Sequence, residues 1–136
     1  MTKDELKQKL RSAYALQKQL ETEFVMLQNF KDAANKVTPV YNLAPGGTGT
    51  RQRIENATVK TIDLENDIWQ DFENLVLALV EVRKLINSVD DVLLRSVLYK
   101  RYLNYQKWEQ IAAELGYSWK QIHRLHNKAL NDILRK

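Results

Sequence analysis

Basic and amide side chains recur at helical spacing near the end of this sequence. Lys120, Arg124, Asn127 and Asn131 fall on one side of a helical wheel, opposite a stripe of apolar residues. Arginine and lysine can donate hydrogen bonds to the O6 and N7 atoms of guanine, and asparagine can pair with adenine. The pattern therefore predicts a helix over residues 119–134 that lies in the major groove of double-stranded DNA.

The residues nearest the N-terminus of such a helix usually reach base edges. We therefore expect base contacts from Trp119, Lys120, Gln121, Arg124 and Asn127. Phosphate contacts are expected from the basic and polar side chains around this face, namely Lys100, Arg101, Lys107, Ser118, His123 and Lys128. Trp119 could instead pack against the preceding helix. The simplest alternative is that Lys120 and Arg124 only keep a surface helix soluble.

A shorter helix is expected just before this one. Its apolar residues are spaced at i, i+3, i+4 and i+7, namely Trp108, Ile111, Ala112 and Leu115. Gly116 suits the C-terminus of a helix, and Ser118 can cap the helix that follows. The inward stripe of the second helix is Ile122, Leu125, Ala129 and Ile133. The two helices have the pattern of a helix-turn-helix.

A third helix is expected to support this pair. Residues 91–103 carry an apolar face with basic residues on its rim, and Ser88 or Asp90 could serve as the N-cap. Together with the two later helices it would form a DNA-binding domain over residues 89–136.

The charge distribution agrees with a nucleic-acid partner. From Arg95 to the C-terminus there are nine basic residues and three acidic ones, although the net charge of the whole chain is only +4. A basic block on a compact unit is the electrostatic pattern of a nucleic-acid-binding domain.

The first 88 residues are predicted to form a long antiparallel helical hairpin. Apolar residues alternate at spacings of four and three over residues 2–36 and 53–87, as in a coiled coil. Each helix would extend roughly 50 Å. A hairpin that thin cannot bury both apolar stripes, so we expect a homodimer. The residues expected at its interface are Leu20, Phe24, Leu27, Ile68, Phe72, Leu75 and Leu79.

Residues 38–52 are expected to form the loop between the two helices, because they hold both prolines and three of the four glycines. The GGTGTR sequence does not end in the GK[ST] of a phosphate-binding loop, and no strand precedes it. We therefore interpret the segment as a connection rather than a nucleotide site.

Composition excludes several classes of protein. Cysteine is absent, so there is no disulfide framework and no thiolate metal site. The longest apolar run, residues 75–80, is far shorter than the roughly 18 residues of a membrane-spanning helix, and no secretory signal is visible. His123 and His126 have a metal-compatible spacing but no third ligand beside them. We expect an all-α, cytoplasmic non-enzyme without cofactor or metal.

Residues 92–134 resemble region 4 of bacterial sigma-70 type factors. The shared features are the LxxRY-like lead helix at residues 98–102, the WEQIAAELG helix, and a helix that starts at Ser118 and ends in KAL. The resemblance implies base contacts at Trp119, Lys120 and Arg124. Sigma recognition helices commonly carry an Arg-Glu pair where this chain has Trp119 and Lys120, so we expect it to read a different promoter sequence.

The whole chain resembles the small phage-encoded late transcription regulators of the RinA/ArpU-like group. In that group a helical N-terminal part with a Pro-Gly-Gly loop, here Pro45-Gly46-Gly47, precedes a sigma region 4-like domain. The resemblance implies a sequence-specific activator of late phage genes in the bacterial host, with RNA polymerase as a further partner. Two alternatives stay open. One is a DNA-packaging subunit like a small terminase, and the other is a coiled-coil adaptor of RNA polymerase.

Overall fold

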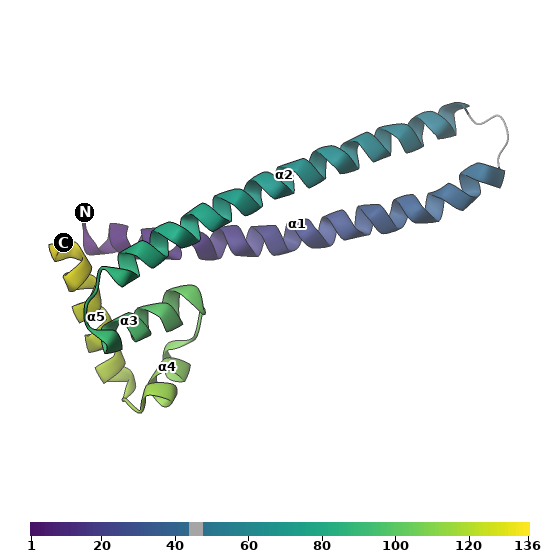
Figure 1. Cartoon of the computed structure of the whole chain (residues 1–136). Helices are drawn as coiled ribbons and strands as arrows, with labels where there is room; N and C mark the ends of the chain where they lie inside the picture. The colour runs from purple at the N-terminus through teal and green to yellow at the C-terminus, as the bar shows by residue number, and fades with distance from the viewer. Residues whose placement is uncertain (44–47) are drawn as a thin grey trace. The chain divides into compact units, whose positions relative to one another are not determined.

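The structure is a computed structural model that describes residues 1–43 and 48–136 (Figure 1). All regular secondary structure in these residues is helical, which confirms the all-α prediction. The elements are α1 (Lys3–Leu43), α2 (Thr48–Asn87), α3 (Val92–Leu98), the π-helical turn η1 (Tyr99–Leu103), α4 (Trp108–Leu115) and α5 (Trp119–Arg135). They form two compact units, one of residues 1–16 and 75–136 and the other of residues 17–74. Within this described part, no helix combines the length and the apolarity needed to cross a membrane.

The two long helices extend into the loop predicted over residues 38–52, so that prediction was too long at both ends. A proline inside a helix removes one backbone hydrogen bond, and α1 continues past Pro39 despite that loss. Gly49 lies in the first turn of α2, where amide groups lack intrahelical partners in any sequence, so a glycine interrupts little. Pro45, Gly46 and Gly47 all lie outside the described residues.

In the unit of residues 17–74, α1 and α2 lie antiparallel. Lys31 Nζ on α1 lies 3.8 Å from Glu65 Oε2 on α2. Glu23, earlier on α1, lies close enough to Asp71, later on α2, for the Asp71 carboxylate to contribute to the raised pKa of Glu23. Low-numbered residues of one helix thus face high-numbered residues of the other, as in the predicted hairpin.

Burial within one chain corrects the predicted oligomerisation surface. Four of the seven residues expected there are no more than 7% exposed, namely Leu20, Leu27, Ile68 and Leu75. In the unit of residues 17–74 the two helices of one chain pair with each other, so packing within the chain already covers Leu20, Leu27 and Ile68. Leu79 is half-buried. Only Phe24 and Phe72 remain exposed, at 44% and 39%.

In the unit of residues 1–16 and 75–136, one apolar core joins the two ends of the chain. Figure 1 shows the first turns of α1 beside the C-terminal end of α5. The buried residues of this core are Leu6, Leu10, Val82, Ile86, Val89, Leu94, Leu98, Tyr102, Ala129, Leu130 and Ile133. Full burial of a leucine or isoleucine contributes roughly 1.5–3 kcal/mol, so these contacts hold α5 firmly against the long helices.

The N-cap of α3 is Asp91, rather than the Ser88 or Asp90 suggested by the sequence. Asp91 Oδ1 accepts a hydrogen bond from the Leu94 amide at 3.1 Å. Ser88 and Asp90 have other partners. The Ser88 hydroxyl donates to the Leu85 carbonyl at the end of α2, and the Asp90 carboxylate lies 3.1 Å from Lys136 Nζ.

The single helix predicted over residues 91–103 changes its winding at Tyr99. The amide of Asn104 donates to the Tyr99 carbonyl at 3.0 Å, and the amide of Gln106 donates to the Lys100 carbonyl at 2.9 Å. These spans are wider than an α-helical turn, and such π-helical turns often occur at functional sites.

Candidate functional site

The elements α4 and α5 begin and end where the sequence predicts. Gly116 ends α4 in the left-handed conformation, at φ 73°. That conformation suits glycine because it has no Cβ, and it lets the Tyr117 amide donate to the Ala112 carbonyl at 3.0 Å. The predicted glycine C-terminus is confirmed, and the tight turn sets the direction of α5.

Ser118 caps α5 in a reciprocal arrangement with Gln121. The Gln121 amide donates to Ser118 Oγ at 3.2 Å, and the Ser118 amide donates to Gln121 Oε1 at 3.0 Å. This capping box confirms the predicted N-cap. It also uses the side-chain oxygen of Gln121 as an acceptor, and the Nε2 group of that residue is left to contact another molecule.

A small apolar cluster fixes α4 and α5 to each other. Its buried members are Val97, Ile111, Ala112 and Ile122, with Trp108, Leu115 and Leu125 packed around them. These include the whole inward stripe expected for α4 and the first two residues of the stripe expected for α5, whose Ala129 and Ile133 belong to the larger core. Because Ile111 and Ile122 are fully buried, the opposite face of α5 has a fixed orientation.

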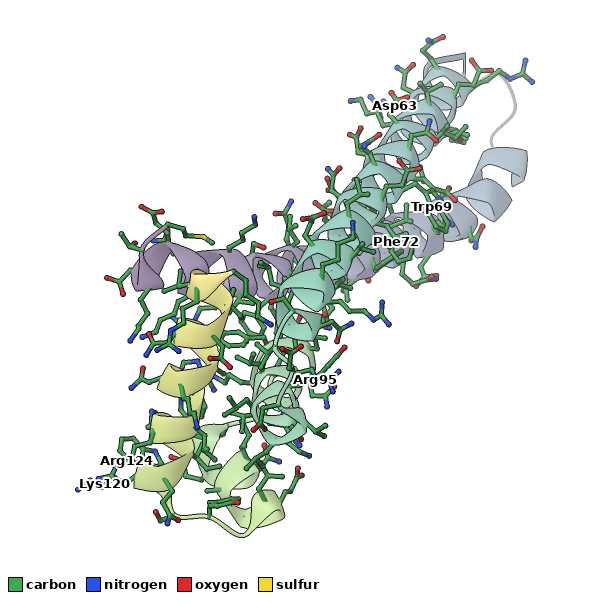
Figure 2. All side chains as sticks on the ribbon, turned by 60° about the vertical axis from the view of Figure 1, so that its left-hand side comes forward. Asp63, Trp69, Phe72, Arg95, Lys120 and Arg124 are labelled. Atoms are coloured by element: carbon green, nitrogen blue, oxygen red, sulfur yellow. The ribbon has the colours of Figure 1, made fainter. Side chains whose placement is uncertain are left out.

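That opposite face carries a row of exposed basic residues. Lys120, Arg124 and Lys128 follow one another at four-residue spacing, and all three are exposed. Figure 2 shows Lys120 and Arg124 pointing away from the body of this unit. Asn127 is exposed beside them. No ion pair within the described residues engages these three cations, so their charge is presented to solvent.

Two of the side chains predicted to contact phosphates have partners inside the unit. Lys100 Nζ lies 2.6 Å from Glu114 Oε2, and its side chain is only 25% exposed. Arg101 donates from Nη1 to the Gln106 carbonyl at 3.0 Å, and its guanidinium lies 4.5 Å from the centre of the Trp108 ring. The ion pair with Glu114 corrects the expectation for Lys100. The hydrogen bond of Arg101 uses one of the five N–H groups of its guanidinium, so its phosphate contact stays a prediction. Lys107, in contrast, is exposed.

His123 is held between two tryptophans. Its ring lies 4.6 Å from that of Trp108 and 3.9 Å from that of Trp119. Burial lowers the pKa of His123, and the charge of Arg101 lowers it further. The side chain is therefore neutral at pH 7, and its Nε2 atom is buried. The predicted phosphate contact of His123 stays a prediction, and in this arrangement a neutral ring would have to make it.

Trp119 remains 55% exposed at the start of α5. Its ring contacts that of His123 at a tilt of 46°, and it does not belong to the apolar cluster between α4 and α5. Of the two alternatives for this residue, packing into the preceding helix is not what the structure shows. The four-residue spacing from Trp119 to His123 was a sequence signal for this contact.

His126 is a core residue. It is 5% exposed, and its Nε2 lies 2.7 Å from the Tyr102 hydroxyl. Burial, reinforced by nearby cations of which Lys7 has the largest effect, lowers its pKa to about 3. It is therefore a neutral hydrogen-bonding residue at pH 7.

A family model described as a protein of unknown function (DUF1492) matches residues 43–133. The chain belongs to the DUF1492 family. The match covers α2, α3, η1 and α4 and nearly all of α5, so the DUF1492 region contains the whole basic row on α5. No curated protein and no solved structure matches the chain.

The described part of this DUF1492 chain holds no group of three or more His, Cys, Asp or Glu residues that could bind a metal ion. The side chains brought together on α5 are cations, amides and an exposed tryptophan. Such groups can donate hydrogen bonds to an anionic or base-edge acceptor, and none of them is a nucleophile with a neighbouring base.

Proposed function

We propose that this protein is a sequence-specific DNA-binding transcription regulator, in which α5 enters the major groove. The observation that supports this most is the exposed row of Lys120, Arg124 and Lys128 on a helix whose other face is fixed in a core. An α-helix fits the major groove, and arginine or lysine at its outer face can donate to guanine. The α4–turn–α5 arrangement then acts as a helix-turn-helix.

The side chains expected at bases are those exposed on the first half of α5, namely Trp119, Lys120, Gln121, Arg124 and Asn127. Gln121 would contact a base through its Nε2 donor, while its side-chain oxygen accepts the hydrogen bond that caps the helix. Lys107 and Lys128 are expected at phosphates, together with the Ser118 hydroxyl. The exposed Trp119 ring is suited to cover a thymine methyl group.

The resemblance to sigma region 4 and to the RinA/ArpU-like regulators extends the proposal. On that basis the protein activates late phage genes in the cytoplasm of a bacterial host, with RNA polymerase as a further partner. The basic charge of the C-terminal segment agrees with DNA as the first of these partners.

We also propose that two copies pair through exposed apolar residues of the hairpin. In the unit of residues 17–74, Phe24, Ile62, Trp69 and Phe72 are between 39% and 55% exposed. Figure 2 shows Trp69 and Phe72 on α2, and their rings lie 5.7 Å apart. Clusters of this kind usually mark an interaction surface. These residues replace the buried seam as the expected coiled-coil-like interface.

The test compares two variants on two DNAs. Fluorescence anisotropy would measure binding to a fragment selected by the protein from the genome of its source, and to a shuffled fragment. Arg124→Ala should weaken binding to the selected fragment by roughly 1–3 kcal/mol and leave the shuffled one nearly unchanged. Lys128→Ala should weaken both, and should reduce the slope of log K against log salt by about one.

Arg83→Ala is the matched control, because Arg83 is an exposed arginine on α2 away from the basic row. It should leave binding to both fragments unchanged. If Arg124→Ala weakens binding to both fragments equally, Arg124 does not read bases.

Oligomeric state separates the regulator from a packaging subunit. The exposed apolar residues of the hairpin fit either a dimer or a larger ring. Light scattering that finds a closed ring of many subunits would favour the small terminase-like function, and a dimer favours the regulator. A protein that retains no DNA would instead fit the coiled-coil adaptor of RNA polymerase.

A further inference from the structure

A cavity of about 370 Å³ lies between the first part of α1 and the connection from η1 to α4. All of its lining residues belong to the unit of residues 1–16 and 75–136. The fully buried Leu10 forms part of its wall. The volume is near the lower end of the range for ligand pockets, roughly 300–1,000 Å³. A molecule the size of a mononucleotide or smaller would fill it.

Three basic residues line this cavity, namely Arg11, Lys107 and Arg101, and no acidic residue does. Arg101 is fixed by its hydrogen bond to the Gln106 carbonyl and by its position over Trp108. That hydrogen bond uses one of the five N–H groups of the guanidinium. Within the described residues, no carboxylate forms an ion pair with any of the three cations. The cavity therefore favours an anion that can accept hydrogen bonds from arginine.

Aromatic rings form the rest of the wall. Tyr14, Tyr102 and Tyr105 line the cavity, and the rings of Tyr14 and Tyr105 meet edge to face at 4.8 Å. Such surfaces bind a planar ring by stacking or edge contacts. Cations next to aromatic walls suit a ligand that has both a flat ring and a negative charge.

The backbone around the cavity is irregular. Tyr105 has φ 56°, in the left-handed region, which costs a bulky residue roughly 1–2 kcal/mol. Arg101 and Tyr102 lie in the π-helical turn η1. Both features are concentrated at ligand-binding sites more often than elsewhere. Here they place three of the lining side chains.

We propose that this cavity binds a small planar molecule that carries an anionic group, either a phosphate or a carboxylate. The anion lies against Arg11, Arg101 and Lys107, and the ring lies against the tyrosines. Binding of this ligand does not depend on the proposed DNA-binding function.

A series of side-chain contacts connects Arg101 in the cavity wall to the start of α5. Its guanidinium lies over Trp108, the Trp108 ring contacts His123, and His123 contacts Trp119 at the start of α5. A ligand that draws Arg101 away from Trp108 changes the first contact in this series. An effect of the ligand on DNA binding therefore rests on the proposed function. Binding of the ligand to the cavity does not rest on it.

Isothermal titration calorimetry on the full chain tests the proposal with four probes. Adenosine monophosphate and 4-hydroxybenzoate each combine a ring with an anion, one as a phosphate and the other as a carboxylate. Adenosine supplies only a ring, and inorganic phosphate supplies only an anion. We expect one or both of the combined probes to bind with one site per chain, at least about tenfold more tightly than adenosine or phosphate.

Arg11→Ala and Lys107→Ala change exposed residues that line the cavity, and each should weaken that binding about tenfold. Arg83→Ala, which removes an exposed arginine elsewhere in the same unit, should leave it unchanged. Which combined probe binds identifies the anion as phosphate or carboxylate.

Three results would overturn the proposal. The first is that neither combined probe binds at concentrations of about 1 mM. The second is that inorganic phosphate binds as tightly as adenosine monophosphate, which would remove the role of the ring. The third is that Arg83→Ala weakens binding as much as Arg11→Ala, which would show a diffuse effect of charge.

Discussion

The two histidines of α5 show how the surroundings of a residue decide what it can do. His126 and His123 are three residues apart, and the sequence alone allowed a metal pair, a core residue or a phosphate contact. Burial makes both neutral at pH 7, one bonded to Tyr102 and the other between two tryptophans. Neither supplies positive charge to α5, so its charge comes from lysine and arginine alone.

The low pKa of His126 predicts that acid destabilises the unit that contains it. The pKa is about 3 in the folded chain and 6.5 in the reference state. The unfolded chain therefore binds more protons between these values. The stabilisation is complete above pH 6.5 and is lost as the pH falls towards 3, by an amount on the order of 4 kcal/mol.

Urea unfolding followed by circular dichroism between pH 7 and pH 4 would measure this loss. His126→Gln removes the titrating group and keeps a hydrogen-bonding side chain near Tyr102, so the free energy of unfolding should depend less on pH. His123→Gln is the control, and it should keep most of the dependence. An unchanged pH dependence in His126→Gln would contradict the assignment.

At the scale of elements, local signals predicted α4 and α5 well. The apolar spacing, Gly116 and Ser118 are all within a few residues of the boundaries they set, and each boundary is confirmed. The failures involve contacts between distant residues. The residues next to Lys100 in the sequence do not predict its ion pair with Glu114. Likewise, the residues next to Arg101 do not predict that its guanidinium lies over Trp108.

The cavity was missed for the same reason. It combines residues of α1 with residues near η1, about ninety positions later, and its wall depends on a left-handed tyrosine that has no sequence signature. The predicted loop is too long because the helices α1 and α2 tolerate Pro39 and Gly49, and residue type alone does not indicate that tolerance.

The turn between α4 and α5 gives a prediction at this scale. Gly116 has φ 73°, and a Cβ at this position would meet no atom within 4 Å. Gly116→Ala should therefore lower the free energy of unfolding through backbone strain alone, by roughly 1–2 kcal/mol. Chemical denaturation of the two proteins measures the difference.

Gly49→Ala is the matched control, since a Cβ there also meets open space and no positive φ is involved. Its stability should be equal to that of the unchanged chain or slightly higher, because alanine favours helix. Equal stability of Gly116→Ala and the unchanged chain would show that the turn tolerates a side chain.

At the scale of the whole molecule, each unit leaves a different surface exposed. The unit of residues 17–74 exposes Phe24, Ile62, Trp69 and Phe72, and the unit that contains α5 exposes the row of Lys120, Arg124 and Lys128. The first surface is suited to a second copy of the chain, and the second to a polyanion. This division of roles agrees with a regulator that pairs through its hairpin and binds DNA through α5.

Self-association should depend on the exposed residues of α2. Ile62 and Trp69 share one face of the helix and are 53% and 55% exposed. Replacing both with glutamine should weaken the dimer at least about tenfold, because each buried side chain contributes roughly 1.5–3 kcal/mol. Sedimentation equilibrium over a range of concentrations measures the change.

Val92→Gln serves as the control, because Val92 is 72% exposed at the start of α3 and lies outside the hairpin. It should leave the dimer intact. If the unchanged chain is monomeric at all concentrations tested, the proposed pairing is wrong.

The proposed DNA binding is tested most directly by asking whether the chain selects particular DNA sequences through α5. The full chain would be mixed at physiological salt with random fragments of the genome of its source, and retained fragments would be sequenced. A base-reading α5 predicts that a few discrete fragments near promoters are strongly enriched. It also predicts that the enrichment disappears in Lys120→Ala/Arg124→Ala and persists in Arg83→Ala. Retention of no fragment, or the same fragments with Lys120→Ala/Arg124→Ala, would contradict it.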